Sequence, residues 1–181
     1  MLELSLHILD IVQNSIQADA NCIEIEVCDK TEENIFSFHV KDDGCGMNEE
    51  TLAKITNPFY TSKNKKTGLG IPLLKQHAEA CEGGVVVESK PGKGTLIKAE
   101  FSNNHIDRQP LGNIVDTVVG IIRANADIQI RYVHCTDQGE FVLDTEEIKQ
   151  ELQGLRIDNP DVLAFLKDML NENIAELEKT N

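Results

Sequence analysis

A lysine-rich stretch between positions 57 and 75, NPFYTSKNKKTGLGIPLLK, has the residue types of a phosphate-binding loop. It carries four lysines and no acidic residue, although the whole chain has a formal net charge of -14. Its Gly-Leu-Gly turn stands where a helix is expected to begin, and the free backbone N–H groups at a helix start attract anions. The chain has neither a G-x-x-x-x-G-K-S/T nor a G-x-G-x-x-G motif. The residues expected to contact phosphate are Lys63, Lys66, Thr67, Gly68, Leu69 and Gly70.

A stripe of polar side chains near the N-terminus offers a second set of candidate ligands. Residues 2–18 are rich in Leu, Ile and Val and predict a largely buried helix. The polar residues within it recur at spacings of three and four, which places them on one face. Such a stripe is either a solvent-exposed edge or the wall of a polar cavity. Its members are His7, Asp10, Asn14 and Gln17.

A carboxylate at the end of a predicted strand is the third candidate. Apolar residues alternate through IFSFHVKDDG as far as Val40, and Asp42 continues in the same register. We therefore expect Asp42 to point toward the core, where a carboxylate needs hydrogen-bond donors. Asp43 is the alternative and would instead cap the turn. The glycines that end the strand are Gly44 and Gly46.

The segments that position these residues alternate between helices and pairs of strands. Antiparallel pairs of strands with helices on one face give a two-layer α+β sandwich over residues 1–103. The expected elements are a helix at 2–18, strand runs at 22–28 and 35–44, helices at 48–55 and 70–81, and strands at 85–89 and 95–101.

A small acidic α+β domain is expected at residues 111–181, after a polar linker at 104–110. We expect a helix with an apolar face, then a hairpin, then helices that begin near Asp144 and Asn159. This unit could dock on the first domain, form a homodimer or bind a partner. The apolar positions of the first helix are Leu111, Val115, Val118 and Ile122, and those of the last are Val162, Leu163, Leu166, Met169, Leu170 and Ile174.

Composition limits the classes of partner and compartment. The net charge of -14 argues against nucleic acid as the main partner, because phosphate-backbone binding needs a basic face. No apolar run reaches membrane-spanning length, and the first ten residues lack a signal-peptide pattern, so we expect a cytoplasmic protein without a membrane partner. The five cysteines are odd in number and never spaced C-x-x-C, which favours reduced thiols.

The order of these motifs resembles the ATP-binding domain of the GHKL superfamily, which includes gyrase-type topoisomerases, heat-shock chaperones, sensor histidine kinases and mismatch-repair ATPases. DIVQNSIQADA resembles the N box, VKDDGCGMN the first glycine box, the lysine-rich stretch the ATP lid and second glycine box, and SKPGKGT the last box. The lid is most similar to that of sensor histidine kinases, and the N box to the mismatch-repair type. The resemblance covers roughly residues 2 to 101.

The resemblance implies a site for ATP and Mg²⁺ in a Bergerat-type fold. Asp42 would accept a hydrogen bond from the exocyclic amine of adenine, and Met47 would pack on the purine. Gly44 and Gly46 would let the backbone approach the base and sugar closely. Asn14 would offer Mg²⁺ a neutral oxygen.

Catalysis and phosphate binding would come from the N box, the lid and the last box. Asp10 stands where hydrolases of the superfamily carry a glutamate as general base, and Asp is shorter by one methylene. Asp10 therefore does not decide between hydrolysis and transfer. We expect the lid to be mobile without nucleotide and ordered with it. The implied nucleotide contacts here are Thr61, Lys63, Lys66, Thr67, Gly68, Leu69, Gly70 and Thr95.

Three functions are compatible with this resemblance. The first is a free-standing kinase-like domain that transfers the γ-phosphoryl group of Mg-ATP to a separate protein. It would lack a dimerisation and phosphoacceptor segment, because the N box begins within the first ten residues. The second is a nucleotide-gated protein-binding switch with little turnover. The third is a clamp-type ATPase dimer.

Overall fold

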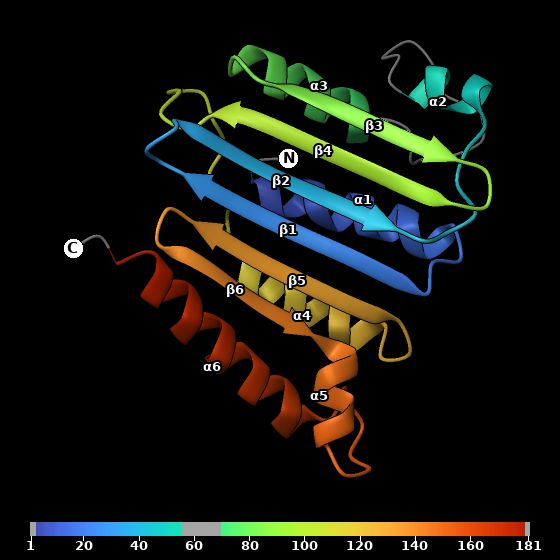
Figure 1. The fold of residues 1–181 in the computed structure, drawn as a ribbon, viewed down its shortest axis with the longest axis vertical. Coiled ribbons are helices and arrows are strands. Elements are labelled where there is room, and N and C mark those ends of the chain that lie inside the picture. The colour runs from blue at the N-terminus through green and yellow to red at the C-terminus, as the bar shows by residue number, and fades with distance from the viewer. Residues whose placement is uncertain (1–2, 56–69, 180–181) are drawn as a thin grey trace.

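One six-stranded sheet with the order β3-β4-β2-β1-β5-β6 organises the part of the chain described in this computed structural model, residues 3–55 and 70–179 (Figure 1). All neighbouring strands pair antiparallel except β1 and β5, which pair parallel. The strands are β1 (Cys22–Lys30), β2 (Ile35–Asp42), β3 (Gly84–Lys90), β4 (Gly94–Ser102), β5 (Gln129–Thr136) and β6 (Gly139–Asp144). The helices are α1 (Leu4–Gln17), α2 (Glu49–Ile55), α3 (Gly70–Ala80), α4 (Ile114–Ala124), α5 (Thr145–Glu151) and α6 (Pro160–Leu177). The α+β fold with a mostly antiparallel sheet is thus confirmed.

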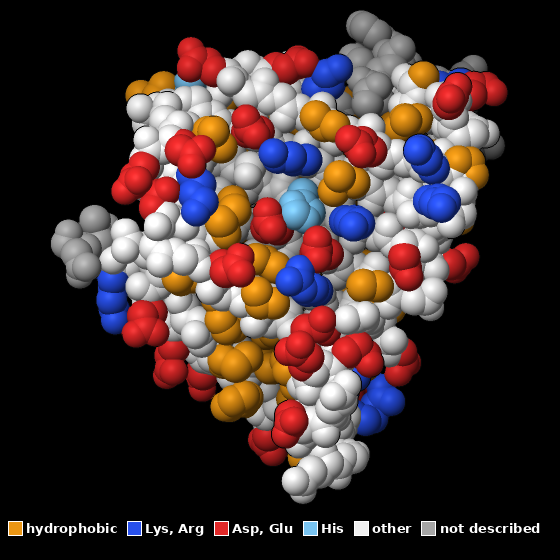
Figure 2. All heavy atoms as spheres, viewed as in Figure 1, with side chains coloured by type: hydrophobic (Ala, Val, Ile, Leu, Met, Phe, Trp, Pro, Cys, Tyr) orange, Lys and Arg blue, Asp and Glu red, His pale blue; other side chains and the backbone are white. Residues whose placement is uncertain are grey.

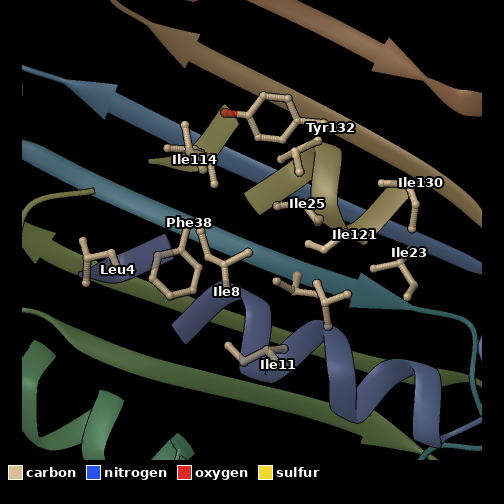
Figure 3. Packing of buried hydrophobic residues seen from close by; sticks show 14 of the residues in the cluster. Leu4, Ile8, Ile11, Ile23, Ile25, Phe38, Ile114, Ile121, Ile130 and Tyr132 are labelled. Carbon is tan, nitrogen blue, oxygen red and sulfur yellow. The ribbon is translucent and has the colours of Figure 1, made fainter. Parts of the chain in front are cut away.

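The core lies between the sheet and the layer that contains α1 and α4. Strand residues alternate between buried and partly exposed positions, so one face of each central strand is apolar. Figure 3 shows side chains of α1 and α4 directed toward those of β1, β2 and β5. Burial of this shared face holds the two helices on the sheet. The labelled residues are Leu4, Ile8, Ile11, Ile23, Ile25, Phe38, Ile114, Ile121, Ile130 and Tyr132.

Capping residues fix the start of the two C-terminal helices as the sequence predicts. The Asp144 side chain accepts a hydrogen bond from the backbone N–H of Glu146 at 2.9 Å. The Asn159 side chain accepts from the N–H of Asp161, also at 2.9 Å, and Pro160 occupies the first helical position. These bonds satisfy donors that have no partner within the helix. The apolar face of α6 packs on β5, β6 and α4.

The C-terminal segment is hydrogen-bonded to the first segment through the sheet. Strand β5 pairs with β1, and a single hydrophobic cluster includes residues from both segments. The expected linker also contacts the first segment, since the carbonyl of Pro110 accepts a hydrogen bond from the N–H of Leu4 at 3.0 Å. Division into domains at 1–103 and 111–181 stays a prediction. What the structure adds is that the second segment extends the sheet of the first.

A disulfide between Cys28 and Cys135 departs from the expectation of reduced thiols. The two cysteines stand opposite each other in the parallel register of β1 and β5, with Cα atoms 4.5 Å apart. That distance lies within the range that a disulfide requires. The pairing joins residues 107 positions apart, so the spacing of cysteines along the chain gave no sign of it. The free cysteines are Cys22, Cys45 and Cys81.

The sheet face opposite α1 and α4 carries charged side chains. Figure 2 views this face and shows acidic and basic side chains interspersed over it. The His39 ring lies 3.2 Å from a carboxylate oxygen of Glu24 and 3.4 Å from one of Glu26. Within residues 3–55 and 70–179, no helix combines the length and the hydropathy needed to cross a membrane.

Candidate nucleotide site

A pocket of about 470 Å³ lies between α1, the end of β2, β4 and the start of α3. Its volume is in the range of small-molecule sites. Polar residues from the predicted motifs and apolar residues from α1, α3 and β4 line it together. The predicted residues among them are Asp10, Asn14, Asp42, Gly46, Met47, Gly70 and Thr95.

Asp42 is the buried carboxylate of this pocket, with 8% of its surface exposed. One oxygen, Oδ1, accepts hydrogen bonds from the N–H groups of Gly44 at 2.9 Å and Thr95 at 3.2 Å. The other oxygen, Oδ2, accepts from the hydroxyl of Ser15 at 2.7 Å. A carboxylate has about four lone-pair positions, so Asp42 keeps capacity for one further donor from the pocket.

Asp43, and not Asp42, has the structural role of holding the turn before β1. It is exposed, and its Oδ1 accepts from the backbone N–H groups of Asn21 at 2.8 Å and Cys22 at 2.9 Å. These bonds hold the turn before β1 against the end of β2. The alternation that directs Asp42 to the core therefore directs Asp43 away from the pocket.

The polar stripe of α1 divides between two environments. Asp10, Asn14 and Gln17 line the pocket, so this part of the stripe is a cavity wall and not only a solvent-exposed edge. His7 is buried instead, near Gln109 of the expected linker. Burial is the main cause that lowers the pKa of His7 from its usual value to about 4. His7 is therefore neutral at pH 7.

Asp10 lies against the first residue of α3. A Cβ atom placed on Gly70 would come within 1.9 Å of Asp10 Oδ2, so a larger residue at position 70 would require the Asp10 side chain to move. Burial raises the pKa of Asp10 above its usual value. A carboxylate with a raised pKa is a better proton acceptor, and this one stands at a helix N-terminus that attracts anions.

The glycines of the first box permit close contact between two turns. A Cβ on Gly46 would lie 2.0 Å from the carbonyl oxygen of Lys90, and Gly46 has a φ of 66°. A Cβ on Gly44 would lie 2.7 Å from the carbonyl oxygen of Ala18. The close approach of a nucleotide to these glycines stays a prediction, and the structure shows that both also lie close to the protein backbone. Gly46 also lines the pocket.

A hydrogen-bonded chain connects Asp42 with Met47 through the last box. The Thr95 N–H donates to Asp42, and the Thr95 and Ser89 hydroxyls are 2.9 Å apart. The Ser89 hydroxyl in turn accepts from the N–H of Met47 at 2.8 Å. These bonds hold Met47 and Thr95, which are both half-buried and both line the pocket.

Most of the predicted lid residues lie outside the described part of the chain. The structure places Gly70 at the start of α3, where the sequence predicts a helix N-terminus. The predictions that fall on residues 56–69 concern Thr61, Lys63, Lys66, Thr67, Gly68 and Leu69, together with the lid's mobility.

Ser15 and the apolar wall of the pocket were not predicted from the sequence. Ser15 is a buried residue next to Asn14, and its hydroxyl oxygen, whose proton goes to Asp42, also lies 3.3 Å from the carbonyl oxygen of Ile11. A serine on the buried side of an apolar helix is a signal that could have been read, because its hydroxyl needs an acceptor. The apolar wall residues are Ile11, Ala18, Ile55, Ile71 and Ile97.

Comparison with curated proteins finds bacterial sensor kinases among the relatives. Sporulation kinase E of Bacillus subtilis (strain 168) is 33% identical over 90 residues, which are 49% of this chain and 12% of the kinase. Sporulation kinase C of the same organism is 34% identical over 92 residues, or 50% of this chain and 21% of that kinase. The chain thus spans about a fifth or less of the length of these two relatives.

Comparison with solved structures gives the same fold class. The structure of the N-terminal domain of a DNA repair protein superposes with a TM-score of 0.60 and 21% identity, over 80% of this chain and 53% of that one. The Aquifex aeolicus MutL ATPase domain complexed with ADP superposes with a TM-score of 0.50 and 13% identity over the whole of both chains. At these identities the likeness concerns the fold.

A family model settles the relationship for the first segment. The model described as histidine kinase-, DNA gyrase B-, and HSP90-like ATPase matches residues 2–105, more than half of the chain. This range contains the pocket, the buried aspartate and all four predicted motifs. The chain therefore belongs to the histidine kinase-, DNA gyrase B- and HSP90-like ATPase family, and its first segment is a GHKL ATP-binding domain similar to the catalytic domains of histidine kinases.

Proposed function

We propose that this chain binds Mg-ATP in the pocket beside α1 and transfers the γ-phosphoryl group to a separate protein. The observation that carries the proposal is Asp42, a buried carboxylate held by three donors from Ser15, Gly44 and Thr95, which keeps room for one donor from the pocket. The exocyclic amine of adenine is a donor of the required kind.

The residues present fit a purine at one end of the pocket. Apolar side chains from α1, α3 and β4 provide walls for a flat ring, and Met47 adds a polarisable side chain. Guanine presents a carbonyl oxygen where adenine presents its amine. That oxygen would face the Asp42 carboxylate without a donor, so the pocket should select adenine.

Metal and phosphate binding are assigned to the other side of the pocket. Asn14 offers a side-chain oxygen from α1, on the same face as Asp10. Mg²⁺, when bound, would neutralise charge on the phosphates. Asp10 beside Gly70 is placed to orient or deprotonate an attacking group, and the backbone at the start of α3 would bind an anion. The lid residues Lys63 and Lys66 complete this assignment as predictions from the sequence.

Transfer to a protein is favoured over hydrolysis by the relatives. The relatives described above are sporulation kinases. The lysine-rich stretch resembles the lid of sensor histidine kinases. In such a transfer the acceptor side chain attacks the γ-phosphorus, the bond to the β-phosphate oxygen breaks, and ADP leaves. A protein-binding switch with little turnover and a clamp-type ATPase remain the alternatives.

The test follows the γ-phosphate with isotope-labelled Mg-ATP. The wild-type chain is incubated with the proteins that co-purify with it, and label is measured both on protein and as free phosphate. Label on a partner protein, absent with Asp42→Asn, supports transfer. Steady release of free phosphate that stops in Asp10→Asn supports hydrolysis instead. Nucleotide binding that changes partner affinity, with label in neither product, supports the switch.

A further inference from the structure

A groove between α5 and α6 lies beyond the part of the chain that matches the family. It has a volume of about 720 Å³ and is lined by apolar side chains together with acidic ones. Ile148 from α5, Leu152 directly after α5 and Val162 from α6 are at least half-buried, whereas Phe165 at the border of the groove is 64% exposed. An exposed phenylalanine beside an apolar depression is typical of an interaction site.

The rim of the groove is acidic, and no ion pair among the described residues neutralises its negative charge. Glu147, Glu151 and Asp161 line it and are exposed, and no ion pair joins them to any of the described residues. The two lysines of α5 and α6 nearest in sequence already have other partners, since Lys149 pairs with Glu146 at 2.8 Å and Lys167 with Asp116 at 2.7 Å. Figure 2 shows apolar side chains gathered over this end of the molecule with acidic side chains around them.

We infer that this groove docks a basic amphipathic helix of a partner protein. An apolar stripe of the helix would enter between α5 and α6 and contact Phe165, while lysines or arginines on its flanks would meet the acidic rim. Helix α5 has seven residues, which corresponds to about 10 Å, so the groove accepts roughly two turns of helix. Such a ligand would present apolar residues at positions i, i+3 or i+4, and i+7.

Charge selects this occupant over the other candidates. A second copy of the chain would bring an identical acidic rim and a further net charge of -14, so a symmetric contact here would oppose like charges. An anionic lipid surface would be repelled for the same reason. A basic helix gains from both the apolar floor and the carboxylates. The groove is lined by α5 and α6 and the nucleotide pocket by α1, α2, α3, β2 and β4, so the two sites share no lining residue and the inference does not rest on the proposed function.

The first test uses a synthetic peptide of 18 residues with leucines in a helical stripe and lysines elsewhere, labelled with fluorescein. A scrambled peptide of the same composition is the charge-matched control. We expect saturable binding to the full chain by fluorescence anisotropy, at least tenfold tighter for the amphipathic peptide. Equal affinity for the scrambled peptide would overturn the inference, because it would show attraction by net charge alone.

Variants locate the binding surface. Phe165→Ser should weaken binding of the amphipathic peptide at least tenfold, and Glu151→Gln should reduce its dependence on salt. Ile106→Ser is the matched control, since Ile106 is 94% exposed but lies in the connector. Circular dichroism checks that each variant is folded. Unchanged affinity in Phe165→Ser, or an equal loss in Ile106→Ser, would contradict the assignment to this groove.

Two further measurements address the other occupants. Sedimentation velocity should show that the groove does not dimerise the wild-type chain, and flotation with phosphatidylcholine and phosphatidylserine vesicles should show that it does not bind lipid. A dimer that Phe165→Ser dissociates would assign the groove to a second copy of the chain, and vesicle binding that Phe165→Ser abolishes would assign it to a lipid surface. Either result would overturn the proposed helix.

Discussion

The hydroxyl of Ser15 donates a hydrogen bond of 2.7 Å to Oδ2 of Asp42, and this bond joins helix α1 to the end of strand β2. It fixes the orientation of the carboxylate at the floor of the pocket. Because the bond is buried, its loss leaves an acceptor without one of its donors.

Replacing Ser15 should affect both stability and nucleotide binding. Ser15→Ala should lower the free energy of unfolding by about 1–2 kcal/mol, since a buried hydrogen bond to a charged group is lost. It should weaken ATP binding by less than Asp42→Asn does, because the carboxylate itself remains. Urea denaturation and calorimetric titration measure the two effects. An ATP affinity that falls further in Ser15→Ala than in Asp42→Asn would contradict the role given to the carboxylate.

Substitution of Gly46 tests the close contact between the two turns. Gly46→Ala introduces a Cβ 2.0 Å from the Lys90 carbonyl oxygen at a φ of 66°, so it should destabilise the fold by more than about 1 kcal/mol. Two glycines serve as graded controls. Gly92 has a φ of 70° with open space around it, and Gly84 has open space without a positive φ.

The expected order of destabilisation follows from these environments. Gly46→Ala should cost most because it combines strain with a steric clash, Gly92→Ala should be intermediate, and Gly84→Ala should be the mildest. Thermal unfolding of the three variants gives the order directly. Equal melting temperatures for the first two variants would show that the clash with Lys90 is relieved at little cost.

Acid should destabilise the protein over the pH range in which His7 binds a proton in the unfolded state but not in the folded state. The pKa of His7 is about 4 in the folded chain because of burial, against 6.5 for an ordinary histidine. Between these values the unfolded state binds more protons, so stability falls as the pH decreases from about 6.5 toward 4. Burial lowers the pKa of His77 and His134 as well, which adds to the same trend.

The measurement is the free energy of unfolding as a function of pH in wild type and His7→Gln. The variant should show a shallower decline below pH 6.5, because it lacks one of the three histidines whose pKa burial lowers. Burial raises the pKa of Asp10 and Glu178, and these carboxyls act in the opposite direction at lower pH. Identical slopes in the two proteins would contradict a buried neutral His7.

The Cys28–Cys135 pair predicts a specific count of reactive thiols. In denaturant without reductant, alkylation should label three cysteines, and after reduction it should label all five. Reduction should also lower the free energy of unfolding by about 2–4 kcal/mol, because the disulfide restricts a long loop in the unfolded chain. Cys22→Ser is the control that removes a free thiol. Five reactive cysteines in protein that has not been treated with reductant would show that Cys28 and Cys135 do not pair.

Local patterns predicted the parts of the site that depend on local geometry. Alternation along β2 directed Asp42 to the core, and residue preferences at helix starts located the caps at Asp144 and Asn159. These features depend on neighbours within a few residues, so the sequence displays them directly. The family resemblance then assigned chemistry to residues that lie far apart along the chain.

Long-range pairing could not be predicted in the same way. The parallel contact between β1 and β5, and with it the Cys28–Cys135 pair, depends on a register between strands about a hundred residues apart. The hydrogen bond from Ser15 to Asp42 depends on how α1 packs on the sheet. Nothing in the local sequence states these distances, because they result from the shared burial of the whole core.

The most direct test of the account is isothermal titration of the folded chain with Mg-ATP, in wild type, Asp42→Asn and Asn14→Ala. We expect 1:1 binding to wild type, a loss of at least tenfold in affinity for Asp42→Asn, and an affinity in Asn14→Ala that no longer responds to Mg²⁺. GTP should bind wild type more weakly than ATP. Unchanged ATP affinity in folded Asp42→Asn, or no binding of ATP to wild type, would contradict the central claim that this buried carboxylate recognises adenine.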